Sequence, residues 1–109
     1  MPPRQLGLIQ GTLDLLVLKT LAARTLHGYA VATAIHDRTD GELAIDDAAL
    51  YQSLHRLERQ GFVASEWGPS ENNRRARYYT VTPDGRRRLR EQEADFRRYA
   101  RAVFAVLEA

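Results

Sequence analysis

The chain of 109 residues contains no cysteine, which excludes disulfide bonds and cysteine-rich zinc sites and fits a reducing cytoplasm. It also has no long apolar run. Its most apolar stretch, LDLLVLKTLAA, carries Asp14 and Lys19 and is too short to span a bilayer. The N-terminal MPPRQLGLIQ lacks the apolar segment of a secretory signal. We therefore expect a soluble, cytoplasmic protein that has no membrane partner.

Sequence motifs of catalysis and metal binding are missing as well. The three histidines, His27, His36 and His55, are spaced by nine and nineteen residues and form no HExxH motif. The sequence has no phosphate-binding loop, no dinucleotide fingerprint and no G-x-S-x-G motif. We expect that the protein is not an enzyme and that it has no metal site and no cofactor.

Charge of either sign is not in large excess. The 16 basic and 14 acidic residues give a formal net charge of +2, although the sequence pI is about 9.3. A hydrophobic content of 44% is enough for the core of one domain. The arrangement of the charges, rather than their sum, must therefore indicate whether the partner is a nucleic acid.

The hydrophobic pattern predicts four helices. Residues 11–24 are apolar on most sides, with Thr12 as the expected N-cap, and residues 28–39 follow after a turn at Gly28. Residues 46–61 carry one stripe of leucines at helical spacing, with Asp46 or Asp47 as the expected cap and Gly61 as the stop. Residues 82–109 begin with a Thr82 cap and Pro83 in the first helical position.

Two short segments, 62–67 and 76–82, are rich in β-branched and aromatic residues and flank the turn-forming GPSENNRR. They predict a β-hairpin. Three helices, a hairpin and a long helix in this order indicate a mainly α (α+β) fold, a winged helix-turn-helix with a two-stranded wing. We expect residues 1–81 to form the winged-helix DNA-binding domain and residues 82–109 to form a C-terminal dimerisation helix.

The helix predicted over residues 46–61 is the candidate for reading DNA. Its polar side chains fall opposite the leucine stripe, small residues at its start allow close approach, and Gln52 has the amide needed to read adenine. An ordinary amphipathic surface helix is the alternative interpretation. The candidate DNA-binding residues on this helix are Ala48, Ala49, Tyr51, Gln52, His55 and Arg56.

A polar and cationic cluster precedes the second predicted strand. Such side chains at the tip of a wing would contact DNA phosphates beside the site that the helix reads. A solvated loop is the alternative, since charge clusters are common on hairpins. The candidates are Asn72, Asn73, Arg74, Arg75 and Arg77.

The last helix carries apolar residues at heptad spacing, which is typical of a helix that packs along another helix. About 25 residues of helix extend roughly 37 Å, more than a small winged domain covers, so pairing with a second copy is favoured over packing back on its own domain. The first predicted helix, residues 11–24, is apolar on most sides and would supply the rest of the interface. The candidate interface residues are Leu13, Leu16, Leu89, Phe96, Tyr99, Val103 and Val106.

The segments GTLDLLVLKTL, LHGYAVATAI, ALYQSLHRLERQGFV and SEWGPSENNRRARYYTVTPDGRRRL together resemble the PadR family of transcriptional regulators over roughly residues 6–107. The resemblance implies a homodimeric winged-helix repressor that binds a near-palindromic double-stranded DNA operator. It is greatest to short-tailed members, which are often encoded near transport genes.

The resemblance also names a candidate ligand, because some PadR-like proteins bind a small hydrophobic inducer at the dimer interface. Phe96, Tyr99 and Phe104 would line such a site, although helix packing explains their spacing equally well. Gln52 stands where the family usually has proline, and Ala48 and Ala49 depart from the usual glycine and hydroxyl pattern. A winged-helix module that binds proteins and not DNA is the alternative function.

Overall fold

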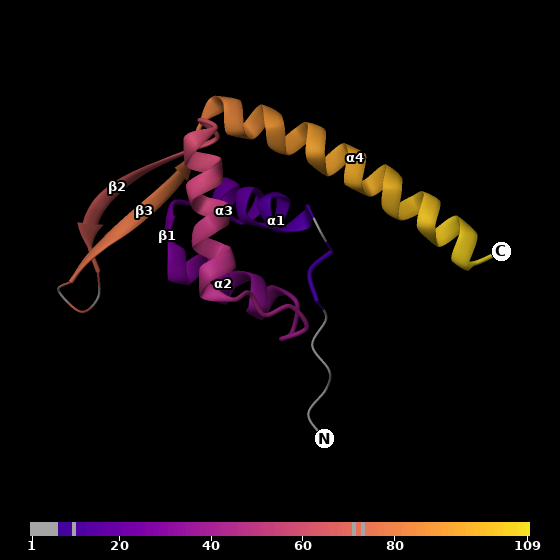
Figure 1. Ribbon diagram of the computed structural model, residues 1–109, viewed down its shortest axis with the longest axis horizontal. Helices are drawn as coiled ribbons and strands as arrows, with labels where there is room; N and C mark the ends of the chain where they lie inside the picture. The colour runs from indigo at the N-terminus through magenta and orange to yellow at the C-terminus, as the bar shows by residue number, and fades with distance from the viewer. Residues whose placement is uncertain (1–6, 10, 71, 73) are drawn as a thin grey trace, which may run out of the picture.

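The computed structural model describes residues 7–9, 11–70, 72 and 74–109, and this part of the chain forms a winged helix-turn-helix with a long C-terminal helix (Figure 1). Its helices are α1 (Thr12–Ala23), α2 (Gly28–Arg38), α3 (Asp47–Arg59) and α4 (Pro83–Leu107), and its strands are β1 (Leu26–His27), β2 (Val63–Pro69) and β3 (Arg75–Val81). The α+β fold class and the winged-helix architecture predicted from the sequence are confirmed.

One apolar core holds the helices and the sheet together. The apolar stripe of each of the first three helices points into it, and the inner end of the hairpin closes it. Burial of these side chains is the main favourable contribution to folding. Its most buried members are Val17, Leu18, Leu21, Val31, Leu50, Leu54 and Leu57, to which the sheet adds Val63, Tyr79 and Val81.

The sheet has one strand more than the sequence predicts. The described strands are antiparallel in the order β1-β3-β2, and Leu26 pairs with Tyr79. Strand β1 contains two residues, too few to show the alternation by which a strand is recognised in a sequence. Strands β2 and β3 form the predicted wing, which projects beside α3 (Figure 1).

The predicted helix ends are mostly confirmed. Asp46 caps α3 by accepting a hydrogen bond from the backbone N–H of Ala49 at 3.3 Å, and Thr82 caps α4 by accepting one from Gly85 at 3.0 Å. The prediction for α1 is wrong. Gly11 occupies the N-cap position, and the Thr12 hydroxyl donates to the carbonyl oxygen of Ile9 at 2.6 Å, so Thr12 does not cap the helix.

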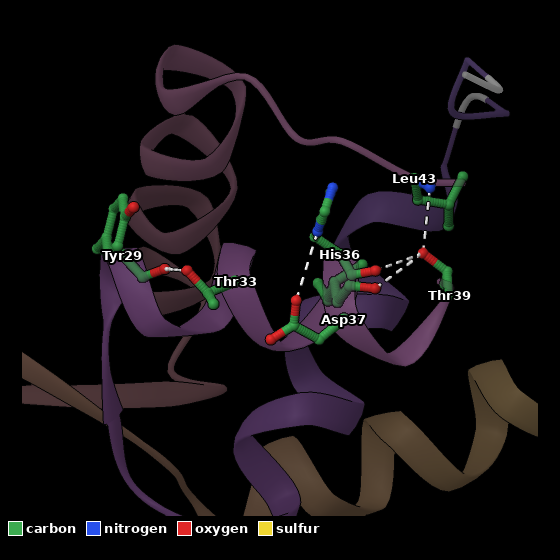
Figure 2. Close-up of polar contacts among 7 residues, drawn as sticks. Tyr29, Thr33, His36, Asp37, Thr39 and Leu43 are labelled. Carbon is green, nitrogen blue, oxygen red and sulfur yellow. Dashed lines mark hydrogen bonds and ion pairs between the residues drawn. The ribbon is translucent and has the colours of Figure 1, made fainter. Parts of the chain in front are cut away.

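The connection between α2 and α3 is organised by Thr39 (Figure 2). Its hydroxyl donates to the carbonyl oxygen of Ile35 at 2.9 Å and accepts from the backbone N–H of Leu43 at 3.1 Å. The same view shows His36 and Asp37 side by side, with 3.4 Å between Nδ1 and Oδ1. Thr39 therefore closes the end of α2 and holds the turn that follows it.

Only the first turns of α4 pack on the domain, and the rest of the helix extends away from it (Figure 1). Gly85 and Leu89 are the buried residues of α4. Leu89 is only 7% exposed and belongs to the core of its own chain, so its assignment to a dimer interface is corrected. None of the described helices combines the length and the apolar composition needed to cross a bilayer.

Candidate nucleic-acid interface

Helix α3 presents one buried and one exposed face. Leu50, Ser53, Leu54 and Leu57 point inward, and the predicted DNA-reading residues lie on or beside the opposite face. Ala49 is half-buried at the start of the helix. A shallow groove of about 450 Å³ along the outer face is lined by Ala48, Tyr51, Gln52, His55, Arg56 and Arg59.

The position of Tyr51 is set by contact with α2. A Cβ atom on Gly28 would lie 3.0 Å from Cε1 and 3.1 Å from the hydroxyl oxygen of Tyr51, so the ring rests directly on the start of that helix. His27 caps the same helix end, because its Nδ1 accepts from the backbone N–H of Ala30 at 3.3 Å. Tyr51 is nevertheless 51% exposed and remains open to a ligand.

The cationic cluster of the wing is exposed where the structure describes it. Asn72 and Arg74 lie at the hairpin tip, whereas Asn73 lies outside the described residues. The guanidinium carbon of Arg75 lies 5.3 Å from the centre of the Trp67 ring, and that of Arg77 lies 5.6 Å from it. These distances allow cation–π attraction on an exposed indole.

Arg77 also has partners outside the wing tip. Its Nε donates to Oγ of Ser65 at 2.7 Å, and one terminal nitrogen lies 3.3 Å from Oε2 of Glu58 on α3. Ser65 in turn donates to the same Glu58 oxygen at 2.5 Å. This hydrogen bond lowers the pKa of Glu58 below its ordinary value, and Arg77 lowers it further, against the smaller opposing effect of burial.

Arg56 contacts α1, which the sequence did not predict. Its Nε donates to Oδ2 of Asp14 at 2.9 Å and a terminal nitrogen donates to Oδ1 at 2.6 Å, while Ser53 donates to Oδ1 at 2.6 Å. Burial alone would raise the pKa of Asp14, but the hydrogen bonds from Arg56 and Ser53 and the charge of Arg56 lower it overall. Asp14 therefore joins α1 to the helix that carries the candidate DNA-reading residues.

Helix α3 and the wing face a common hollow of about 720 Å³. It brings together residues from both predicted DNA-contacting segments, although they are far apart in the sequence. Trp67 is part of it, although the sequence favoured a structural role at the hairpin over a ligand contact for this residue. The exposed side chains around the hollow include Tyr51, His55, Trp67, Arg74, Arg75 and Arg77.

A second surface, here termed the α1–α4 groove, is apolar. Leu16 of α1 and Phe96 of α4 line this groove of about 420 Å³ together with Phe104, and Lys19 and Glu93 pair across it at 2.8 Å. Leu13 and Leu16 are half-buried against the core of the chain. The predicted interface residues of α4 beyond Leu89 are all exposed: Phe96, Tyr99, Val103 and Val106.

Side chains that could ligate a metal ion do not gather into a cluster in the part of the chain that the structure describes. No group of three or more His, Asp or Glu residues there is arranged to hold a metal ion. The outer face of α3, the α1–α4 groove and the wing instead carry hydrogen-bond donors, cations and apolar side chains on open surfaces. Such surfaces suit macromolecular binding.

Residues 17–91 match the transcriptional regulator PadR-like family. A PadR family regulator from Eggerthella lenta is 36% identical, with a TM-score of 0.78 over 92% of this chain and 85% of that chain. A transcriptional regulator from Clostridium thermocellum is 26% identical, with a TM-score of 0.80 over 88% and 90% of the two chains. An uncharacterized protein X from Lysinibacillus sphaericus is 29% identical over 77% of each chain.

The family match covers part of α1, all of α2, α3 and the sheet, and the start of α4, so it includes α3 and the wing, which form the candidate DNA-binding surface. The chain therefore belongs to the PadR-like family of transcriptional regulators, and it is a DNA-binding regulator.

Proposed function

We propose that the protein is a homodimeric repressor that binds a near-palindromic operator. The observation that carries this proposal is the common hollow between α3 and the wing, where Tyr51 and His55 of α3 and the exposed guanidinium groups of the wing face the same volume. A helix that reads bases and a wing that grips the adjacent backbone need this arrangement.

Helix α3 of each subunit would enter the major groove. Gln52 is exposed, and its amide would donate to and accept from an adenine edge, while Ala48 and Ala49 would leave room for close approach at the start of the helix. Tyr51 and His55 flank this contact. With two subunits, the half-sites are expected about 34 Å apart, or roughly 10 base pairs from centre to centre.

The wing would contact phosphates beside each half-site. Arg74 and Arg75 at the tip are exposed and carry no acidic neighbour among the ion pairs of the described residues. Asn72 can donate its amide hydrogens to the same backbone. A DNA contact by Asn73 is a prediction from the sequence alone. Neutralising phosphates in this way releases counterions, which makes binding strongly dependent on salt.

The dimer would form through α1 and the outer part of α4. A helix whose apolar side chains extend beyond its own domain leaves an apolar surface in water, and a second copy would cover it. Residues 82–109 would then act as the dimerisation helix of the winged domain 1–81, with the turns around Gly85 and Leu89 anchoring it to that domain. The interface would use Leu13, Leu16, Phe96, Tyr99, Val103 and Val106.

The proposed target of repression is an operon near the gene for this protein, for example an operon for membrane transport. The apolar α1–α4 groove supports a small hydrophobic inducer as a candidate ligand, with Phe96 and Phe104 in contact with it. Tyr99 would complete the site from the exposed side of the same helix. An inducer bound there would act on the dimer contact rather than on the DNA-binding surface.

The proposal is tested by selecting duplexes from a random-sequence pool with the purified full-length chain at moderate salt. Enrichment of a motif with twofold symmetry supports a dimeric operator-binding protein, and the position of that motif upstream of a gene identifies the target. If no sequence is enriched and the protein shows no salt-dependent binding of DNA, the result would instead favour a module that binds proteins. Transcription from the selected promoter in a purified system distinguishes repression from activation.

A further inference from the structure

The arginines of the wing lie in two different environments. Arg74 and Arg75 are near the tip, whereas Arg77 lies two residues further along β3 and reaches back to α3 through Glu58. We propose that Arg77, Ser65 and Glu58 form a latch that fixes the wing relative to α3, so that Arg77 is a positioning residue for DNA binding rather than a phosphate contact. The inference rests on the proposed function, in which both elements touch one DNA site.

The latch consists of three polar contacts between adjacent elements. Arg77 donates to Ser65 at 2.7 Å across the hairpin and lies 3.3 Å from Glu58, and Ser65 donates to the same Glu58 oxygen at 2.5 Å. Ser65 belongs to β2, Arg77 to β3 and Glu58 to α3, so the three residues join both strands of the wing to the helix. Charge-assisted hydrogen bonds of this kind are stronger and more directional than neutral ones.

Trp67 is a further neighbour of the arginine. Trp67 is directly opposite Arg77 in the register of the hairpin, and the guanidinium carbon lies 5.6 Å from the centre of its ring. A guanidinium that lies over an indole and also donates to a hydroxyl and a carboxylate has few orientations left. Arg77 is therefore held in place before any ligand arrives.

The charge around Arg77 argues against a phosphate contact. The carboxylate of Glu58 compensates the guanidinium charge, and a phosphate brought to the same place would meet that carboxylate. Arg75 also stacks on Trp67, but it has no acidic partner among the ion pairs of the described residues. The arginines thus have two separate roles. Arg74 and Arg75 bind the DNA phosphates, and Arg77 fixes the position of the wing that carries them.

The wing needs such a constraint because the core and the pairing with β1 hold only its inner half, up to Tyr78. The buried residues of the hairpin are Val63, Tyr79 and Val81, and the strands beyond them are half-buried or exposed. A hairpin fixed at one end can pivot, and a change in its angle moves the tip relative to α3. The latch restrains this pivot about halfway along the wing.

The latch is tested by fluorescence anisotropy titrations of the full chain with a duplex that the wild-type protein enriches from a random pool, and with an unselected duplex. Ser65→Ala is the main variant because it removes two hydrogen bonds without changing any charge. Glu58→Gln and Arg77→Gln are the companions, and Arg74→Gln is the matched control for a phosphate contact. Circular dichroism and thermal unfolding of each variant verify that it is folded.

We expect Ser65→Ala, Glu58→Gln and Arg77→Gln each to weaken binding to the selected duplex by about fivefold, the upper range for an exposed ion pair. The slope of log affinity against log salt should stay unchanged. Arg74→Gln should instead flatten this slope by about 2 in a dimer, or 0.9 for each lost phosphate contact. The double variant with Glu58→Arg and Arg77→Glu should bind better than Arg77→Glu alone.

Different outcomes overturn different statements. If Glu58→Gln tightens binding and Arg77→Gln flattens the salt slope, Arg77 is a phosphate contact and the latch is rejected while the DNA-binding function stands. Failure of the wild-type protein to enrich any duplex rejects the proposed function and, with it, the role assigned to Arg77. A DNA-free measurement tests the geometry separately: Trp67 is the only tryptophan, and Ser65→Ala should raise its quenching by acrylamide, whereas unchanged quenching rejects the latch.

Discussion

The backbone of Gly85 in α4 lies directly against the carbonyl oxygen of Phe62, so that a Cβ atom at Gly85 would be 2.0 Å from that oxygen. The same carbonyl accepts a hydrogen bond from the backbone N–H of Thr82 at 3.0 Å. These contacts join the start of α4 to the segment between α3 and the wing. The direction in which α4 leaves the domain depends on them.

Gly85→Ala should therefore destabilise the protein. A methyl group cannot fit against a backbone oxygen without moving α4 or the α3–β2 segment, and overpacking of this kind typically costs about 1–3 kcal/mol. Urea unfolding followed by circular dichroism measures the change in free energy of unfolding. Gly7→Ala is the matched control, because a Cβ atom there meets nothing within 4 Å. Equal stability of the two variants would contradict the close packing of α4.

Asp14→Asn should lower stability near neutral pH by about 1–3 kcal/mol, because Arg56 and Ser53 lose a charged acceptor. The folded pKa of Asp14 is below its ordinary value of 3.8, so its contribution is complete above that value and is lost as the pH falls through the folded pKa. Urea unfolding between pH 3 and 7 should show that the variant loses less stability on acidification than the wild type. Asp95→Asn, an exposed carboxylate on α4, is the control.

Arg74→Ala combined with Arg75→Ala should weaken binding to all duplex sequences alike. If each of the four guanidinium groups of a dimer neutralises one phosphate, the slope of log affinity against log salt flattens by about 4. Fluorescence anisotropy at several salt concentrations gives this slope. Arg38→Ala removes an exposed charge from α2, away from the common hollow, and should leave the slope nearly unchanged. A double variant with the wild-type slope would remove the wing tip from the DNA contact.

Gln52→Ala should affect specificity more than general affinity. The loss of a bidentate contact to a base costs about 1–3 kcal/mol at the base pair that Gln52 reads and little elsewhere. Titrations with single base-pair variants of the selected duplex locate this pair. A uniform loss across all variants would mean that Gln52 only positions α3. Arg59→Ala, on the same outer face of α3, is the comparison.

Val103→Glu should convert the dimer to monomers. The side chain of Val103 is exposed on the apolar side of α4, and a charge there would be buried without a partner in a helix–helix interface. Sedimentation velocity at micromolar concentration gives the oligomeric state. Ala94→Glu places the same charge on the opposite side of the helix and should leave the dimer intact. A dimeric Val103→Glu variant would mean that the outer half of α4 has another role.

Much of the fold was predictable because the chain carries local signals. The leucine stripe of α3, its Asp46 cap, the Thr82 and Pro83 start of α4 and the turn-forming segment between β2 and β3 each depend on residues close together in sequence. The two-residue strand β1 and the N-cap of α1 at Gly11 were not predicted. β1 is stabilised by pairing with β3, whose residues lie more than fifty positions away.

For the binding surfaces, the sequence identified side-chain types but not their partners. The sequence predicted that both Arg56 and Arg77 contact DNA. Their pairing with Asp14 and Glu58 depends on distances that only the packed chain defines. Leu89 fits the heptad pattern of α4, yet its neighbours at the base of the helix bury it within its own subunit. For Trp67 the sequence favoured a structural role at the hairpin, but it did not show that two arginines lie over its ring.

The sequence by itself determined the order and type of the helices, the wing and the separation of a polar α3 face from its leucine stripe, because periodicity and capping act over a few residues. The tertiary structure alone decided which arginines are paired, which apolar residues of α4 stay exposed and how the wing is held against α3. These depend on contacts between distant segments, whose geometry is set by packing of the whole core and is not encoded in any one stretch of the chain.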